Sequence, residues 1–485
     1  MPGGNKKKNK KKTNNARKQQ KPVDLDTVMK QADAAVESSD LQTALGLYDY
    51  VAKTLRKNRS SSSSSGGGEE EGPSDEALLL SSVLSKLGEV KVSMEDQEGG
   101  KTDFLEAISL LGNGNGNNDE IMEDGDAAAT TTTTTSLPNA MEVAQRHEMK
   151  AGLHLYIGQL SSAEEALQSY KHGVIEWTNC ISILERVGDV NKKEDDDMEE
   201  EGGEKVSAAE ALTEAKRQLI GVHCSIAELY MTDLCYEPDA ESQCELSLKT
   251  ALSLDDVHTS SQPDALQTIA NLRLSQNRGV EAVDYMLNAY QRMKLGVEAL
   301  SNLVGLGRDD DDKKVMVMED QAKELVDVEA ASSLPGFEFR CQSAKLFLEC
   351  ASVLEDSKNG DGNDENNGNE NSSENAKKQE ACIEASIQLL GSLLSENDEV
   401  VEVWYLLGVA FMAATPPNSD EARFYWEKAL EMLHKVKEEL EQAMTGGDSE
   451  EELQEQLSEV ECQIEEINEK LVEVGEIDRC NMEQG

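Results

Sequence analysis

The chain has 485 residues, of which 96 are acidic and 46 basic, and its formal net charge is −50. Nucleic-acid binding depends on Lys and Arg side chains that neutralise phosphates, so this charge argues against direct binding to DNA or RNA. No apolar run approaches the roughly 18 residues of a membrane span, and no apolar stretch follows the Lys-rich N-terminal segment. We therefore expect neither a membrane-spanning nor a secreted protein.

Residues 1–24 are predicted to form a basic, disordered tail. Within it, Lys6 to Lys12 read KKKNKKK and make up the only concentrated positive charge of the sequence. Such a run is typical of a nuclear-import signal. Two other interpretations stay open, namely a merely solvated tail and an arm that contacts RNA.

Residues 25–435 repeat the pattern of a tetratricopeptide helical hairpin. In its clearest copy, residues 263–290, small residues at Ala270 and Ala282 let two antiparallel helices approach closely, and Met286 fills the groove beside them. The other residues that keep this spacing are Ala32, Ala35, Ala44 and Tyr48, then Leu153, Ile157, Ala166 and Tyr170, then Leu266, Ile269 and Ala289, and finally Trp404, Gly408, Phe411, Ala422, Trp426 and Ala429.

Three weaker helix pairs complete the array, at residues 78–111, 212–254 and 339–394. They keep the helical period, but we expect longer insertions between their two helices. One hairpin cannot bury its own apolar face, so neighbouring copies must stack on one another. The sequence therefore predicts an all-α tetratricopeptide-repeat solenoid of about seven hairpins.

Low-complexity segments interrupt the repeats. They are rich in Ser, Thr, Gly, Asn or carboxylates and cannot bury enough apolar surface to offset the entropy lost on ordering. We expect most of them to be disordered spacers; the alternative is that the acidic runs make weak, fluctuating contacts with a cationic client. The predicted inserts are residues 59–75, 111–139, 190–206, 307–332 and 355–379.

The acidic C-terminal region, residues 436–475, is predicted to form an amphipathic helix, followed by a tail at 476–485. Its apolar residues alternate at intervals of four and three, which is the spacing of a coiled-coil seam. Either the seam caps the last hairpin or it mediates self-association. Glu on its flanks would repel a parallel copy, so we expect a monomer. The seam consists of Leu453, Leu457, Val460, Ile464, Ile467, Leu471 and Val474.

No catalytic, cofactor-binding or metal-binding pattern is evident. The nine cysteines include no Cys-x-x-Cys pair, which fits reduced thiols on apolar helix faces. His223 and Cys224 are neighbours but lack further metal ligands or catalytic partners at a suitable spacing. We therefore expect a binding protein that is no enzyme and uses no cofactor.

One alternative is an adaptor for heat-shock proteins, because tetratricopeptide co-chaperones hold a C-terminal carboxylate with Lys, Asn and Arg. The matching positions here carry no cationic donor, so a carboxylate would be left unpaired. A second alternative is a scaffold subunit of a larger complex. The positions compared with the carboxylate clamp are Met29, Asp33, Ala151, Leu155, Gln267 and Asn271.

Two stretches, SIAELYMTDLCYEPDAESQCELSLKTAL at 225–252 and SQPDALQTIANLRLSQNRGVEAV at 261–283, resemble fungal and plant tetratricopeptide proteins. That family acts as assembly chaperone of the ribosomal large-subunit protein number four. The segment VVEVWYLLGVAFMA at 400–413 and the Glu-rich C-terminal helix are similar too. The most specific matches are residues 232–235 and 270–278.

The resemblance implies a dedicated, non-enzymatic chaperone. Such a protein captures a newly made basic ribosomal protein, shields its long basic internal loop and escorts it to pre-60S ribosome assembly. The resemblance also implies a location in cytoplasm and nucleus, with a nuclear import receptor as a further partner.

Candidate contact residues follow from repeat geometry, because the first helix of each hairpin should line the concave surface of a solenoid. An acidic balance alone fits mere solubility. Together with a groove it favours a basic protein segment as ligand, since an enclosing acidic wall focuses potential on what it surrounds. The candidate residues are Asp33, Glu148, Glu228, Asp264, Asn271, Glu402 and Tyr405.

Overall fold

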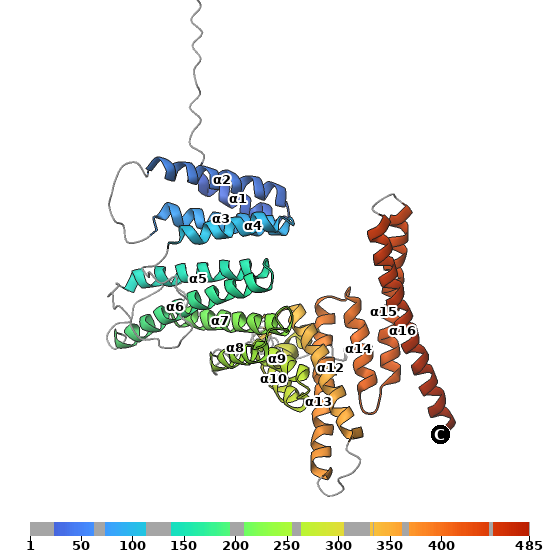
Figure 1. Cartoon of the computed structure of the whole chain (residues 1–485). Coiled ribbons are helices and arrows are strands. Elements are labelled where there is room, and N and C mark those ends of the chain that lie inside the picture. The colour runs from blue at the N-terminus through green and yellow to red at the C-terminus, as the bar shows by residue number, and fades with distance from the viewer. Residues whose placement is uncertain are drawn as a thin grey trace, which may run out of the picture. The chain divides into compact units, whose positions relative to one another are not determined.

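In a computed structural model of the chain, α-helices are the only regular secondary structure within the residues that it describes (Figure 1). The Lys6–Lys12 run and most of the predicted inserts lie outside these residues. No described helix combines the length and the apolar character needed to cross a membrane. The described residues are 24–62, 73–112, 137–194, 208–254, 263–304, 330–332, 334–360, 368–445 and 450–484.

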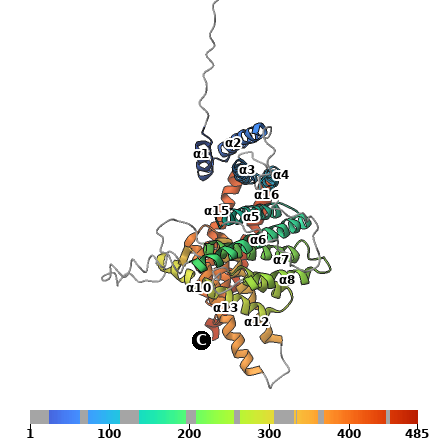
Figure 2. The same ribbon diagram turned by 90° about the vertical axis from the view of Figure 1, so that its left-hand side faces the viewer.

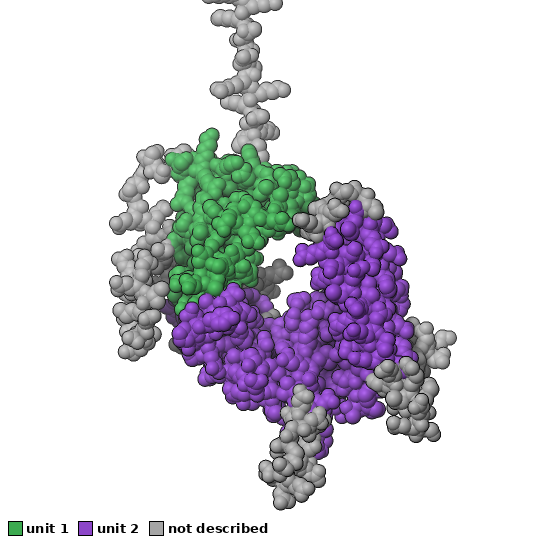
Figure 3. Space-filling view, turned by 45° about the vertical axis from the view of Figure 1, so that its right-hand side comes forward, with its two compact units in different colours: residues 1–176 green, residues 177–485 purple. Residues whose placement is uncertain are grey.

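The chain divides into two compact units, residues 1–176 and residues 177–485, which Figure 3 colours separately. In unit 1, consecutive helices pair as hairpins and lie side by side in both ribbon views (Figure 1, Figure 2). Its helices are α1 (Leu25–Glu37), α2 (Leu41–Ser62), α3 (Asp75–Ser93), α4 (Gln97–Leu110), α5 (Leu137–Gln159) and the first part of α6 (Ala163–Glu194).

Unit 2 continues the same architecture, and its hairpins are α7/α8, α9/α10, α12/α13 and α14/α15. The C-terminal helix packs against the last of these hairpins. The helices of unit 2 are the remainder of α6, then α7 (Ala208–Met231), α8 (Ala240–Leu254), α9 (Asp264–Ser275), α10 (Gly279–Val304), α12 (Phe337–Gly360), α13 (Gly368–Glu396), α14 (Val401–Ala413), α15 (Ser419–Thr445) and α16 (Glu450–Gln484).

The predicted all-α repeat fold is confirmed by the packing of its spacing residues. Ala270, Ala282 and Met286 are fully enclosed in one apolar cluster that joins α9 and α10 to the helices that follow. The equivalent residues of the first and third hairpins are buried as well. In the last hairpin Trp404 and Phe411 stay partly exposed, because they pack at the edges of apolar clusters and not at their centres.

Close helix contact in three hairpins depends on a glycine in the first helix facing an aromatic ring in the second, and in α3/α4 these residues are Gly88 and Phe104. A Cβ atom at Gly158 would lie 2.3 Å from the ring of Tyr170, and one at Gly408 would lie 2.2 Å from Nε1 of Trp426. Real Cβ atoms do not approach this closely. The absence of a side chain at these positions therefore sets the distance between the paired helices.

The prediction of longer insertions is wrong for one of the three weaker pairs, because only residues 94–96 connect α3 to α4. It is confirmed for the other two, where residues 232–239 separate α7 from α8 and residues 361–367 separate α12 from α13, against three residues between α9 and α10. In the turn between α3 and α4, Glu95 adopts a positive φ of 67° and Asp96 caps α4, accepting a hydrogen bond of 3.0 Å from the Gly99 amide. These local bonds close the turn without additional chain.

Helices also extend into several segments that were expected to be inserts. Helix α2 runs to Ser62, α6 runs to Glu194, and α13 begins at Gly368. The expected boundary at residue 435 falls inside α15, which continues to Thr445. Glu, Lys, Gln and Ala dominate the end of α15, and their intrinsic preference for helix extends it until Gly446 and Gly447 follow in the sequence.

The apolar seam of α16 packs on the last hairpin. Ile467 and Val474 are buried in one cluster with Trp426, Ala429 and Leu433 of α15. Val460, Ile464 and Leu471 contact the same cluster from its rim. The seam thus covers the exposed side of the final hairpin within unit 2, which is the packing expected of a capping helix.

Candidate binding surface on the repeat helices

Asp33 lies on α1 and bridges three helices of unit 1. Its Oδ1 accepts a hydrogen bond of 2.5 Å from the Tyr48 hydroxyl on α2 and forms an ion pair of 2.6 Å with Lys86 Nζ on α3. The bond from Lys86, then that from Tyr48, lowers the pKa of Asp33. A cationic ligand at Asp33 would therefore have to compete with Lys86.

Glu148 is exposed on α5, beside a charged cluster that the sequence did not reveal. In this cluster His147 Nδ1 lies 2.5 Å from Glu176 Oε2, and Lys150 Nζ lies 3.8 Å from Glu176 Oε1. Lys150 is buried and also donates to the carbonyl of Gly112, at the C-terminal end of α4. Only the spacing of His and Lys on one face of α5 could have signalled this cluster.

The same hairpin contains a pair of neighbouring imidazoles whose ring planes are tilted by 31°. The rings of His154 on α5 and His172 on α6 have centroids 5.2 Å apart. Burial, followed by the nearby charge of His172, lowers the pKa of His154 to about 4. His154 is therefore neutral at physiological pH and packs as an uncharged ring.

Glu228 on α7 and Asp264 at the start of α9 interact electrostatically in unit 2. Desolvation, and then the charge of Asp264, raises the pKa of Glu228. The opposing effect of a hydrogen bond from Thr268 is smaller. Two carboxylates in one partly desolvated place form an electrostatically strained surface that favours an incoming cation.

Asn271 is exposed on α9, one turn after Gln267. The Gln267 amide donates to the Phe339 carbonyl at 3.2 Å and to the Ser343 hydroxyl at 2.9 Å. Gln267 therefore ties α9 to α12 and serves packing. Asn271 keeps its side chain at the surface.

Glu402 and Tyr405 both lie on α14 and contact neighbouring helices. Glu402 Oε1 forms an ion pair of 2.6 Å with Lys345 Nζ on α12. The Tyr405 hydroxyl donates to Glu466 Oε1 on α16 at 2.5 Å. Burial, then the bond to Glu466, raises the pKa of Tyr405, so its hydroxyl stays protonated and holds the C-terminal helix.

The structure therefore divides the candidate residues by what their side chains contact. Asp33, Glu402 and Tyr405 have partners on neighbouring helices. Glu228 and Asp264 come together, and Glu148 and Asn271 present exposed side chains. Whether these residues contact a ligand stays a prediction.

The chemistry considered for His223 and Cys224 has no support in the geometry. Burial lowers the pKa of His223, and burial, then the charge of Asp264, raises the pKa of Cys224. The thiol therefore remains protonated, whereas a nucleophile or a metal ligand has to be a thiolate. No group of His, Cys, Asp or Glu side chains within the described residues is arranged to hold a metal ion.

The predicted burial of the cysteines holds only in part. Cys180, Cys224, Cys244, Cys341, Cys350 and Cys382 are buried, and none of them forms a disulfide bond with another described cysteine. Cys235 in the turn between α7 and α8 and Cys462 on α16 are exposed instead. Both positions lie off the apolar faces, because one belongs to a turn and the other lies outside the seam.

Comparison with known proteins adds one curated relative. No protein-family model matches the chain. A protein of Schizosaccharomyces pombe (strain 972 / ATCC 24843) named "Probable assembly chaperone of rpl4" is 27% identical over 256 residues. The match covers 53% of this chain and 50% of that protein, so the chain spans about half the length of the curated relative it matches.

Two solved structures are also similar. One is described as "Assembly Chaperone of RpL4 (Acl4) (Residues 1-338)"; it is 18% identical, with a TM-score of 0.43, and the match covers 80% of this chain and 95% of that chain. The other is the TPR domain of P58(IPK), which is 12% identical with a TM-score of 0.18 and matches 92% of this chain and 99% of its own. The resemblance found in the sequence is thus confirmed, and over 256 residues this chain is similar to a probable assembly chaperone of rpl4.

Proposed function

We propose that this protein is a dedicated, non-enzymatic chaperone of a basic large-subunit ribosomal protein, of the type called number four. The observation that carries the proposal is the similarity over 256 residues to the relative named as a chaperone of rpl4. The repeat hairpins support it, because stacked hairpins offer extended surfaces for binding a protein segment.

Electrostatic attraction between the acidic chain and a basic client supplies the physical basis of the proposed function. The chain carries a net charge of −50, and Glu148 and Glu228 are exposed on first helices of its hairpins. A ribosomal protein rich in Lys and Arg would bind RNA or aggregate before assembly. Carboxylates mask those cations until ribosomal RNA, with its denser negative charge, displaces the chaperone.

The cycle that we propose begins in the cytoplasm and ends in the nucleus. The chaperone captures the newly made client as a monomer and shields its basic internal loop. Lys6–Lys12 would then engage a nuclear import receptor, which accepts Lys-rich segments by charge. Release delivers the client to pre-60S ribosome assembly.

The direct test is affinity purification of the tagged full-length chain from fresh lysate, followed by mass spectrometry. One dominant partner, the large-subunit ribosomal protein number four, is the expected result. Co-expression should also keep that client soluble and free of RNA. A stable complex of many subunits without this client would instead indicate a scaffold and would overturn the proposal.

A further inference from the structure

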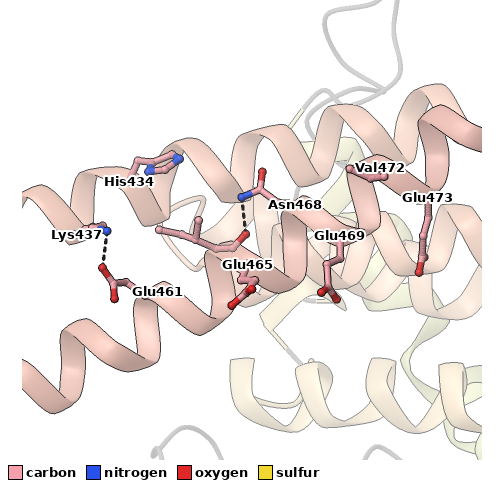
Figure 4. A pocket seen from close by; sticks show the side chains of 9 residues that line it. His434, Lys437, Glu461, Glu465, Asn468, Glu469, Val472 and Glu473 are labelled. Atoms are coloured by element: carbon pink, nitrogen blue, oxygen red, sulfur yellow. Dashed lines mark hydrogen bonds and ion pairs between the residues drawn. The ribbon is translucent and has the colours of Figure 1, made fainter.

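A hollow lies between α15 and α16 (Figure 4). Its volume is about 660 Å³, and residues from both helices line it. Ile464 and Val472 contribute apolar surface, and the side chain of Val472 is 60% exposed. Most of this apolar side chain is left uncovered by the described residues of unit 2.

The rim of this groove is a row of glutamates on α16. Glu461, Glu465, Glu469 and Glu473 follow one another at intervals of four residues, and the last three point to one side of the helix (Figure 4). Like charges at this spacing repel one another along a helix. A bound cation would relieve this repulsion.

One end of the groove already holds a cation of the chain itself. Lys437 Nζ on α15 lies 2.6 Å from Glu461 Oε1. Further along, Glu473 Oε2 lies 3.4 Å from Nζ of the half-buried Lys470 on the same helix. Among the described side chains, Glu465 and Glu469 have no ion-pair partner. The arrangement shows how an ammonium group is held at this rim and leaves two carboxylates for further cations.

Charge complementarity decides which occupant fits. A purely apolar segment would have to bury the glutamates without partners, which costs more than its apolar contacts return. An anionic ligand would be repelled. A segment with cations on one side and an apolar side chain on the other satisfies the carboxylates and covers Val472 at the same time.

We propose that this groove is a docking site for a Lys- and Arg-rich segment of the client that carries apolar side chains among its cations. This inference rests on the proposed function for the identity of the client. The site is separate from the candidate residues on the first helices of the hairpins. It gives the chaperone a second contact, on the cap, with a basic protein.

The test uses the full-length chain and two probes. One probe is a fluorescently labelled 15-residue amphipathic peptide of Lys and Leu at helical spacing, and the other is the purified ribosomal client. The double variant Glu465→Gln/Glu469→Gln should weaken peptide binding about three- to tenfold, the amount expected when two exposed ion pairs are lost. The matched control is Glu455→Gln/Glu459→Gln, which changes the same charge at the same spacing on the same helix, and it should change binding less than twofold.

A variant that is expected to strengthen peptide binding separates an effect on the groove from a loss of folding, because a misfolded protein would bind more weakly. Lys437→Gln removes the cation that occupies Glu461, so this variant should bind the peptide more tightly. Equal effects of the two double variants, or weaker binding by Lys437→Gln, would overturn the groove as a docking site. Tighter groove binding by a peptide of residues 1–23 would assign the site to the chain's own basic segment and overturn the client as occupant.

The two proposals fail in different ways. Suppose that the unmodified chain does not bind the ribosomal client but the groove variants change peptide binding as expected. The proposed function is then wrong, and the groove is still supported as a binding site for a basic peptide. If the client binds the unmodified chain and Glu465→Gln/Glu469→Gln equally well, the groove inference is wrong and the proposed function remains.

Discussion

Single residues set the helix spacing in the last hairpin, and two glycines permit a paired test. Gly408 faces the indole of Trp426, whereas a Cβ at Gly391 on α13 would meet nothing within 4 Å. Gly408→Ala should therefore destabilise the protein by about 1 to 3 kcal/mol through overpacking. Gly391→Ala should stabilise it by about 0.5 to 1 kcal/mol, because Ala costs less backbone entropy in a helix. Urea unfolding of both variants checks the signs, and a shift in the same direction for both would refute the close contact.

Protonation of one partly buried histidine should make the free energy of unfolding depend on pH. The folded-state pKa of His154 is about 4, below its unfolded value of 6.5. The unfolded chain therefore binds more protons between these values, so stability is complete above about pH 6.5 and falls as the pH approaches 4. In urea unfolding at several pH values, His154→Gln should flatten this dependence. A pH dependence that is the same in His154→Gln as in the unmodified protein would contradict this role of His154.

At the scale of elements, the main finding is a helix that folds back on its own array. Ile467 is 2% exposed in the cluster between α15 and α16, and Tyr405 adds a polar tie through Glu466. Ile467→Ala should destabilise this contact by about 2 to 4 kcal/mol, through lost burial and the cavity left behind. Hydrogen exchange should then accelerate in α15 and α16 first, while α1 to α4 in unit 1 keep their protection. Val472→Ala, at an exposed position of the same helix, should change neither.

At the scale of the whole molecule, net charge and local charge placement should affect client binding differently. Glu148→Lys/Glu228→Lys changes first helices, whereas Glu164→Lys/Glu427→Lys changes exposed positions on second helices by the same charge. Both pairs should slow association and weaken its salt dependence, because long-range attraction depends on total charge and is screened over about 8 Å at physiological salt. Only the first pair should also speed dissociation in stopped-flow measurements. Equal dissociation rates would mean that the first helices do not form the contact surface.

The amino-acid sequence alone determined the hairpins. The spacing of Ala270, Ala282 and Met286 is a local, periodic signal, and short-range sterics translate it directly into helix pairs. The acidic character of the chain and the apolar seam of α16 could also be predicted from the sequence, because composition and heptad spacing do not depend on contacts between distant residues.

Only the tertiary structure decided which polar residues serve packing and which stay available. The sequence predicts Asp33 and Tyr405 as exposed positions on first helices. In the structure they bond to Lys86 and Glu466, which lie 53 and 61 residues away in the sequence. The groove beside Val472 likewise requires two helices to meet at one crossing. Such pairings depend on how hairpins stack, and a local period carries no information about contacts between elements so far apart.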